Sequence, residues 1–143
     1  MNEDTAILLK ECNAGCKTAI NSIDQVLPSI MDDELKRLVE YFKEKHVRIC
    51  ESAAILLKEQ GKDEKDPSLM ARVMTWINTE MKLMSGEENR QIAKLMTNGC
   101  NMGIQTLCKA ENDYPDAEDN VKRLLHELVS TEEEFAERMK PFL

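Results

Sequence analysis

The fold is decided by residues 5–60, which read TAILLKECNAGCKTAINSIDQVLPSIMDDELKRLVEYFKEKHVRICESAAILLKEQ. Apolar side chains recur at three- and four-residue steps in each half of this stretch, which is the period of an amphipathic helix. The halves meet at Leu27-Pro28-Ser29-Ile30, where the proline cannot continue a helix. We therefore predict a helical hairpin made of residues 4–27 and 29–60. Its apolar stripes are Leu9, Cys12, Cys16, Ile20, Ile23 and Leu27 in the first helix and Leu35, Leu38, Phe42, His46, Ile49, Ala53 and Leu56 in the second.

Start and stop signals support the second helix. Ser29 is followed three residues later by Asp32, an arrangement that resembles a capping box and predicts Ser29 as the N-cap. Gly61 follows the end of the periodic pattern, and glycine is the usual residue for the left-handed conformation that ends a helix.

Three more helices are predicted downstream. Asp66-Pro67 has the composition of an N-cap and a first helical residue, so a third, shorter helix is expected over residues 67–84. A fourth is expected over residues 87–112, and a fifth from the break at Tyr114-Pro115-Asp116 to the C-terminus. Gly99 and Gly103 lie one turn apart in the fourth helix, where each costs about 1 kcal/mol relative to alanine. We expect another backbone to approach the helix there.

Composition predicts an all-α protein. Aromatic residues make up only 4% of the chain, and no run of alternating β-branched residues is present. The 143 residues fit one domain, residues 1–143. Four long helices and a shorter third one predict a ferritin-like four-helix bundle with a short crossover helix. A plain five-helix up-and-down bundle is the alternative, and the sequence leaves both open.

Charge and cysteine usage narrow the functional classes. The net charge is -8, and the 19 basic residues are scattered, so we predict no nucleic-acid partner. No apolar run approaches the roughly 20 residues of a membrane span, and the N-terminus lacks the features of a signal peptide, so we predict a cytoplasmic protein without a membrane segment. The 5 cysteines are an odd number, which is typical of free thiols in a reducing compartment.

A resemblance to a known family rests on three features. These are the first hairpin, the segment Met74-Thr75-Trp76-Ile77, and the turn Met84-Ser85-Gly86-Glu87-Glu88 before a helix containing Ile92. Together they resemble the bacterial ferritin-like proteins called domain of unknown function 2383, over nearly the whole chain. The resemblance implies a ferritin-like helical core and a bacterial, cytoplasmic protein, and it implies no activity.

The chain departs from ferritin-type iron proteins in its histidines. A di-iron centre of that type uses a Glu-x-x-His motif on each of two helices. Here Lys43 stands three residues before His46, and Arg123 stands three residues before His126. We therefore transfer no iron-ligand roles to this chain.

Cysteines near His46 raise the hypothesis of a different metal site. If the hairpin folds about Pro28, facing positions have residue numbers that sum to about 58, so Cys12 lies level with His46. Cys16 and Cys50 then lie one turn to either side, about 11 Å from each other. Thiolates and imidazole suit Zn²⁺ or Cu(I), so Cys12, His46 and either Cys16 or Cys50 are candidate ligands. The alternative, which we favour, is that the cysteines fill the core around one histidine bonded to a carbonyl or carboxylate.

Two functions compete at this stage, and an enzyme is a third and weaker class. The first is an interaction or structural module that binds a protein partner or a second copy of itself, which exposed Leu8, Trp76 or Met102 in one patch would support. The second is a zinc- or copper-binding protein. Glu132 lies on the apolar stripe of the last helix between Leu128 and Phe135, so it is a candidate buried acid. No catalytic constellation is recognisable, and we predict no cofactor.

Overall fold

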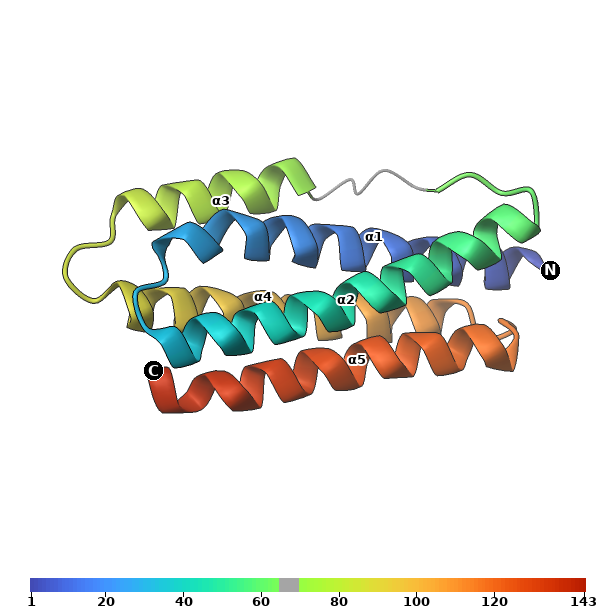
Figure 1. Cartoon of the computed structure of the whole chain (residues 1–143). Helices are drawn as coiled ribbons and strands as arrows, with labels where there is room; N and C mark the ends of the chain where they lie inside the picture. Colours follow the sequence, from blue (N-terminus) through green and yellow to red (C-terminus); the bar gives the residue numbers. More distant parts are fainter. Residues whose placement is uncertain (65–69) are drawn as a thin grey trace.

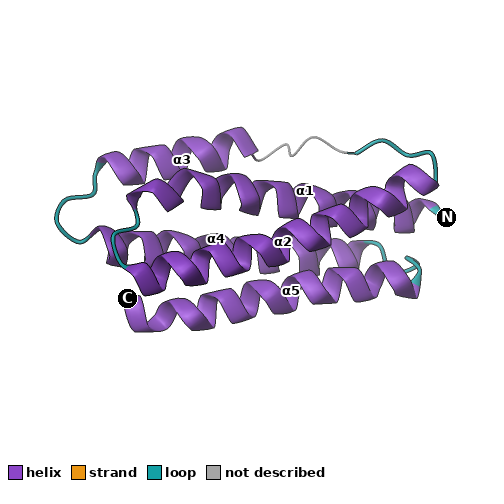
Figure 2. Cartoon of the chain, in the orientation of Figure 1, coloured by secondary structure: helices purple, strands orange, loops and turns teal. Residues whose placement is uncertain are grey.

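The computed structural model describes residues 1–64 and 70–143, and helices and their connections account for all of them (Figure 2). Five α-helices lie in these ranges, with a short 3-10 turn after the first and after the last. The all-α prediction is thus confirmed for the described residues. The helices are α1 (Glu3–Val26), α2 (Asp33–Glu59), α3 (Met70–Lys82), α4 (Glu88–Asp113) and α5 (Asp119–Met139), and the turns are η1 (Leu27–Ser29) and η2 (Lys140–Phe142).

The four long helices α1, α2, α4 and α5 lie side by side, and α3 packs on the outside of α1 (Figure 1). Helices α1 and α2 form one antiparallel hairpin, and α4 and α5 form another. Asn21 contacts Met70 and Gln25 contacts the carbonyl of Met74, so α3 runs in the same direction as α1. Helix α3 therefore returns the chain to the end from which α2 started, and α4 runs parallel to α2 (Figure 1).

The predicted start of the second helix is wrong by a few residues. Ser29 belongs to the turn η1, and the N-cap of α2 is Asp32, whose carboxylate accepts a hydrogen bond from the Leu35 amide at 2.8 Å. An aspartate is as good an N-cap as a serine, and Asp32 leaves room for the chain to turn before the helix begins. The predicted stop at Gly61 is confirmed by its φ of 66°.

The other helix ends agree closely with the patterns, because they depend on local signals. Helix α4 begins and ends within one residue of the predicted range, and α1 begins at Glu3 after its N-cap Asn2. Helix α3 ends at Lys82, before the predicted boundary, and Gly86 has a φ of 83°. The predicted N-cap pair Asp66-Pro67 lies outside the described residues.

The register of the first hairpin also differs from the prediction. The Asn13 side chain donates to the Cys50 carbonyl at 3.4 Å, and Lys43 forms an ion pair with Asp24 at 2.6 Å. Facing residue numbers therefore sum to about 65 and not about 58. The physical reason is that η1 prolongs the first helix past Pro28, and the chain reverses only in the extended residues before α2.

Buried side chains form two apolar clusters, one toward each end of the bundle. The cluster near the α1–α2 turn, here called the turn-end cluster, is built around the stacked rings of Phe42 and Phe135, whose centroids are 4.6 Å apart. The cluster near the N-terminus, here called the N-terminal cluster, includes Leu9 of α1 and Leu125 of α5. Their separation leaves a layer at the middle of the bundle in which polar groups are buried.

Hydrogen bonds join the two hairpins at the N-terminal end of the bundle. The Asn2 side chain donates to the Asp116 carbonyl at 2.8 Å, and the Glu118 amide donates to the Thr5 hydroxyl at 2.8 Å. The start of α5 is thus attached to the start of α1. No helix within residues 1–64 and 70–143 has the length and apolar character that crossing a membrane requires.

Candidate functional site

The layer between the two clusters is occupied by a pair of ionisable side chains, His46 of α2 and Glu132 of α5. His46 is 0% exposed and Glu132 is 6% exposed. The Nδ1 atom of His46 lies 2.7 Å from the Phe42 carbonyl oxygen of its own helix, and its Nε2 atom contacts Oε1 of Glu132. Both ring nitrogens are therefore engaged, and a buried carboxyl group has a direct partner.

The partners of His46 determine where its protons are. A carbonyl oxygen only accepts, so Nδ1 must carry a hydrogen and donate it to Phe42. The contact between Nε2 and Oε1 then needs one shared proton, held either by an imidazolium or by a carboxylic acid, and the pair is neutral as a unit. Burial by itself lowers the pKa of His46, but the hydrogen bond and charge of Glu132 outweigh it, so this pKa is raised.

Helix α4 contributes the thiol of Cys100 and the glycine Gly103 to the same layer. The Cys100 thiol is hydrogen-bonded to Glu132, and burial, reinforced by that carboxyl group, raises the pKa of Cys100. A Cβ atom at Gly103 would lie 3.4 Å from Oε2 of Glu132. The expected approach of another backbone at Gly99 and Gly103 is therefore wrong, because Gly103 faces the Glu132 side chain and a Cβ at Gly99 would meet no atom within 4 Å.

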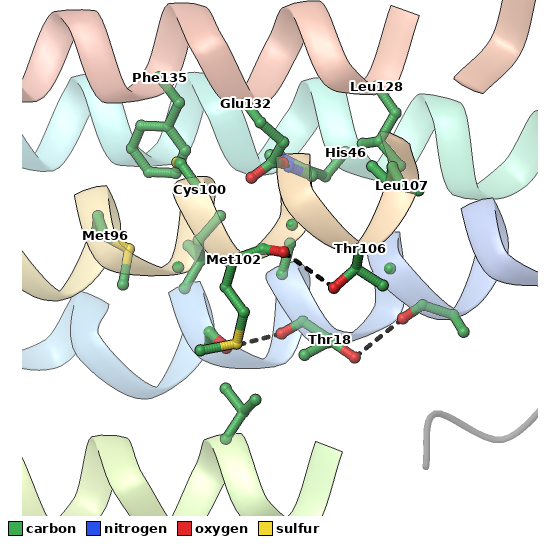
Figure 3. Close-up of a pocket in the computed structure, with 18 of the residues that line it drawn as sticks. Thr18, His46, Met96, Cys100, Met102, Thr106, Leu107, Leu128, Glu132 and Phe135 are labelled. Carbon is green, nitrogen blue, oxygen red and sulfur yellow. Dashed lines mark hydrogen bonds and ion pairs between the residues drawn. The ribbon is translucent and has the colours of Figure 1, made fainter. Parts of the chain in front are cut away.

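A cavity of about 140 Å³ opens beside this layer, mainly between α1 and α4 (Figure 3). His46 and Glu132 lie at its floor, and α3 covers one side of it. Met102 is 42% exposed and marks its outer edge. Most of the lining is apolar or small, including Ala14, Gly15, Ala19 and Ile23 of α1, Val73, Trp76 and Ile77 of α3, Leu95, Met96, Gly99 and Gly103 of α4, and Leu128 and Phe135 of α5.

Three hydroxyl groups of the described residues also line the cavity, and each donates its hydrogen to its own helix. Thr18 donates to the Ala14 carbonyl at 3.0 Å, and Ser22 donates to the Thr18 carbonyl at 2.8 Å. Thr106 of α4 donates to the Met102 carbonyl at 3.0 Å (Figure 3). The oxygens of these side chains therefore keep lone pairs for a further partner but have no hydrogen left to give.

The four candidate metal ligands differ in burial and surroundings. Cys12 and Cys16 are fully buried, and burial raises the pKa of Cys12 to about 12. Cys50 is partly exposed, and its sulfur receives the Asn13 side-chain amide at 3.6 Å. Within residues 1–64 and 70–143, no group of three or more His, Cys, Asp or Glu side chains is placed to hold a metal ion.

The register on which the metal hypothesis depended is wrong, because the level of His46 on α1 lies near Thr18 and Ala19 and not near Cys12. Zinc or copper binding by Cys12, Cys16, His46 and Cys50 stays a prediction. The alternative interpretation of His46 is confirmed, since its two nitrogens bond a carbonyl and a carboxyl group.

The sequence offered Glu132 as a candidate buried acid, beside the interpretation of Glu132 to Glu134 as a solvated charge run with one member turned inward, and did not pair it with His46. A signal for the pair was present: both residues interrupt the apolar stripe of a long helix near its middle, and a buried charge there needs a partner. An exposed patch of Leu8, Trp76 or Met102 would have supported an interaction module. Leu8 is fully buried and does not contribute to such a patch, and Trp76 and Met102 both line the cavity.

The chain is similar to a solved structure over almost its full length. That structure is described as "Crystal structure of DUF305 fragment from Deinococcus radiodurans", with a TM-score of 0.77 and 16% sequence identity. The match covers 98% of this chain and 95% of the other chain. The likeness is one of fold. No family model matches the sequence, and no curated protein does. The chain therefore shares its helical fold with a domain of unknown function.

Proposed function

We propose that this protein is a non-catalytic binding module and that the cavity between α1 and α4 takes up one small, largely apolar molecule. The observation that carries the proposal is an apolar cavity of about 140 Å³ that ends on a buried, hydrogen-bonded ionisable pair. An apolar cavity of about 150 Å³ in a protein is large enough to bind benzene. A module of this kind recognises its ligand by shape and by a few polar groups at the floor.

The distribution of small residues supports this proposal. Gly15 and Ala19 on α1 face the cavity from one side, and Gly99 and Gly103 on α4 face it from the other. Protein interiors are close-packed, and glycine within a helix costs about 1 kcal/mol relative to alanine. Four small residues around one space thus keep a volume open that larger side chains would fill and stabilise.

The state of the polar groups supports binding over catalysis. Both nitrogens of His46 are engaged by Phe42 and Glu132, so neither is directed at a reactant. The raised pKa of Cys100 keeps its thiol protonated, and a protonated thiol is a weak nucleophile. These groups are suited to orient a ligand.

We also propose that the fold is ferritin-like. The short α3 packs on the outside of α1 while the four long helices lie side by side, which supports a crossover role for α3 over a plain five-helix up-and-down bundle. The resemblance to domain of unknown function 2383 depends on the same hairpins and turns. The 5 free cysteines of the chain support a cytoplasmic location.

The proposal is tested with a neutral apolar probe. Trp76 is the only tryptophan in the sequence and lines the cavity, so its fluorescence reports on whether the cavity is occupied by a ligand. We expect toluene to change this fluorescence saturably and to raise the melting temperature, because a ligand that binds only the folded state stabilises it.

Two leucine variants of α4 provide the comparison. Gly99→Leu places a side chain in the cavity and is expected to abolish the toluene response. Asn101→Leu adds the same side chain on the exposed face of α4, outside the cavity lining, and is expected to respond as the wild type does. The proposal fails if the wild type shows no saturable response, or if Gly99→Leu responds equally while its helicity is unchanged.

A further inference from the structure

The side chains that line the cavity present mainly hydrogen-bond acceptors to a ligand. The hydroxyls of Thr18, Ser22 and Thr106 donate to carbonyls of their own helices. The protons of His46 are directed at Phe42 and Glu132, and the Cys100 thiol is hydrogen-bonded to Glu132 as well. Among the described residues that line the cavity, the side chains other than the Trp76 indole therefore offer acceptors to a ligand and no donors.

The charges around the cavity also favour a ligand that donates hydrogen bonds, because they include carboxyl groups. Glu11 of α1 and Glu132 of α5 both line it, and none of the described residues in its lining is lysine or arginine. The basic side chain among the described lining residues, His46, is already engaged by Oε1 of Glu132, so an anionic ligand would lie next to carboxylates without a free cation to receive it. Desolvation would make this contact costly. A cationic ligand would meet the carboxyl group of Glu132.

The carboxyl group of Glu132 has an atom available for such a ligand. Oε1 is engaged by His46, while Oε2 lies opposite Gly103, where α4 has no side chain to cover it. A carboxylate oxygen accepts more than one hydrogen bond, so the contact with Cys100 does not exhaust its capacity. Trp76 and Phe135 add aromatic rings to the lining, and such rings attract ammonium groups.

We propose that the ligand of this cavity is a small protonated amine with an apolar body, whose ammonium group donates to Glu132. The apolar body then packs against the small and aliphatic side chains of α1, α3 and α4. This inference rests on the proposed binding function and specifies the chemical class of its ligand. Charge-assisted hydrogen bonds are about twice as strong as neutral ones, so charge should decide the preference among ligands of equal shape.

Three probes of nearly equal shape test the inference on the wild-type chain. Benzylamine is a cation at neutral pH, benzyl alcohol is neutral, and benzoate is an anion. Binding is followed by Trp76 fluorescence and by the shift in melting temperature. We expect benzylamine to bind about tenfold more tightly than benzyl alcohol, and benzoate not to bind.

Two glutamine variants of α5 test whether Glu132 is responsible for the preference for benzylamine over benzyl alcohol. In Glu132→Gln the amide can still donate to Nε2 of His46, but the negative charge is lost, so benzylamine should bind no better than benzyl alcohol. Glu133→Gln removes a charge from the exposed face of the same helix and should keep the preference. Equal preference for benzylamine in the wild type and in Glu132→Gln would overturn the role of Glu132.

The outcomes separate the inference from the function on which it rests. Binding of benzyl alcohol and benzylamine with equal affinity to the wild type overturns the amine inference and leaves the binding function standing. Absence of binding by all three probes and by toluene overturns both. The wild-type comparison decides between these results even if Glu132→Gln does not fold.

Discussion

At the scale of the residue, the pair of His46 and Glu132 is the most consequential feature of the core. An unpaired charge in an apolar interior costs several kcal/mol, whereas a paired and hydrogen-bonded one is tolerated. Here the Phe42 carbonyl holds the imidazole from one side and the carboxyl group holds it from the other. Each side chain therefore depends on its partner more than on the fold around it.

Breaking the pair on one side should be more damaging than removing it. We expect His46→Leu to lower the free energy of unfolding by about 3–5 kcal/mol, because it leaves Glu132 buried without its partner. The double variant His46→Leu, Glu132→Met should recover most of that loss, since two apolar side chains replace the pair. Urea unfolding measures both, and a double variant as unstable as the single one would contradict the coupling.

The pair also predicts how stability depends on pH. The pKa of His46 is raised above its ordinary value of 6.5 in the folded chain, so the folded state holds the shared proton more tightly than the unfolded state does. This contribution is fully present below about pH 6.5 and is lost as the pH rises through the folded-state pKa. Wild-type stability should therefore fall as the pH rises above about 6.5.

The double variant without the pair is the control for this dependence. Its free energy of unfolding should change less over the same pH interval, because neither leucine nor methionine titrates. Parallel curves for the wild type and the double variant would show that another group is responsible.

At the scale of the element, α4 is shaped by its two glycines. They do not serve a close approach of backbones, as the one-turn spacing suggested. Gly99 borders open space in the cavity, and Gly103 leaves room for the carboxyl group of Glu132. Gly99 thus keeps part of the cavity open, and Gly103 makes room for a buried side chain, each at a loss of helix propensity.

The two glycines should respond differently to the same substitution. Gly99→Ala is expected to raise the free energy of unfolding by up to about 1 kcal/mol, because its Cβ meets no atom within 4 Å and alanine favours the helix. Gly103→Ala should gain less or lose stability, because its Cβ would lie 3.4 Å from Oε2 of Glu132. Urea unfolding of both variants measures these changes. An equal increase in the free energy of unfolding would mean that the Glu132 side chain moves aside at no cost.

At the scale of the whole molecule, two apolar clusters are separated by the polar layer, and hydrogen bonds attach the start of α5 to the start of α1. The long helices run through both clusters, so neither cluster can open without disturbing the other. The cysteines report on this organisation because they differ in burial. Cys108 is exposed, Cys50 is half-buried, and the other thiols lie in the core.

Thiol modification should therefore measure the opening of the whole bundle. Cys108 is expected to react with a thiol reagent as a free thiol does, and Cys108→Ser should remove this fast phase. Cys12, Cys16 and Cys100 are buried, and burial raises their pKa values, so they should react only through unfolding. Their rates should rise together with urea. Fast modification of any of the three with helicity retained would show local opening.

Much of the fold was predictable from local patterns. The ends of α1 and α4, the stop at Gly61 and the all-α class follow from helix period, caps and glycine, which act within a few residues. The start of α2 was misplaced because Ser29 and Asp32 are both good caps, and local chemistry does not choose between them.

The candidate site was less predictable because its parts lie far apart in the chain. Periodicity placed His46 and Glu132 on apolar stripes, but the level at which α2 meets its neighbours depends on the turn between residues 29 and 33. A shift of a few residues there moved Cys12 away from His46 and left Glu132 as the partner.

The sequence by itself determined which segments are helices, because helix period, caps and glycine act between neighbours along one helix. The tertiary structure alone decided that His46 meets Glu132, that Gly103 accommodates the carboxyl group, and that a cavity remains beside them. Such contacts depend on how four rods are placed relative to one another, and no interaction within a single helix specifies that placement.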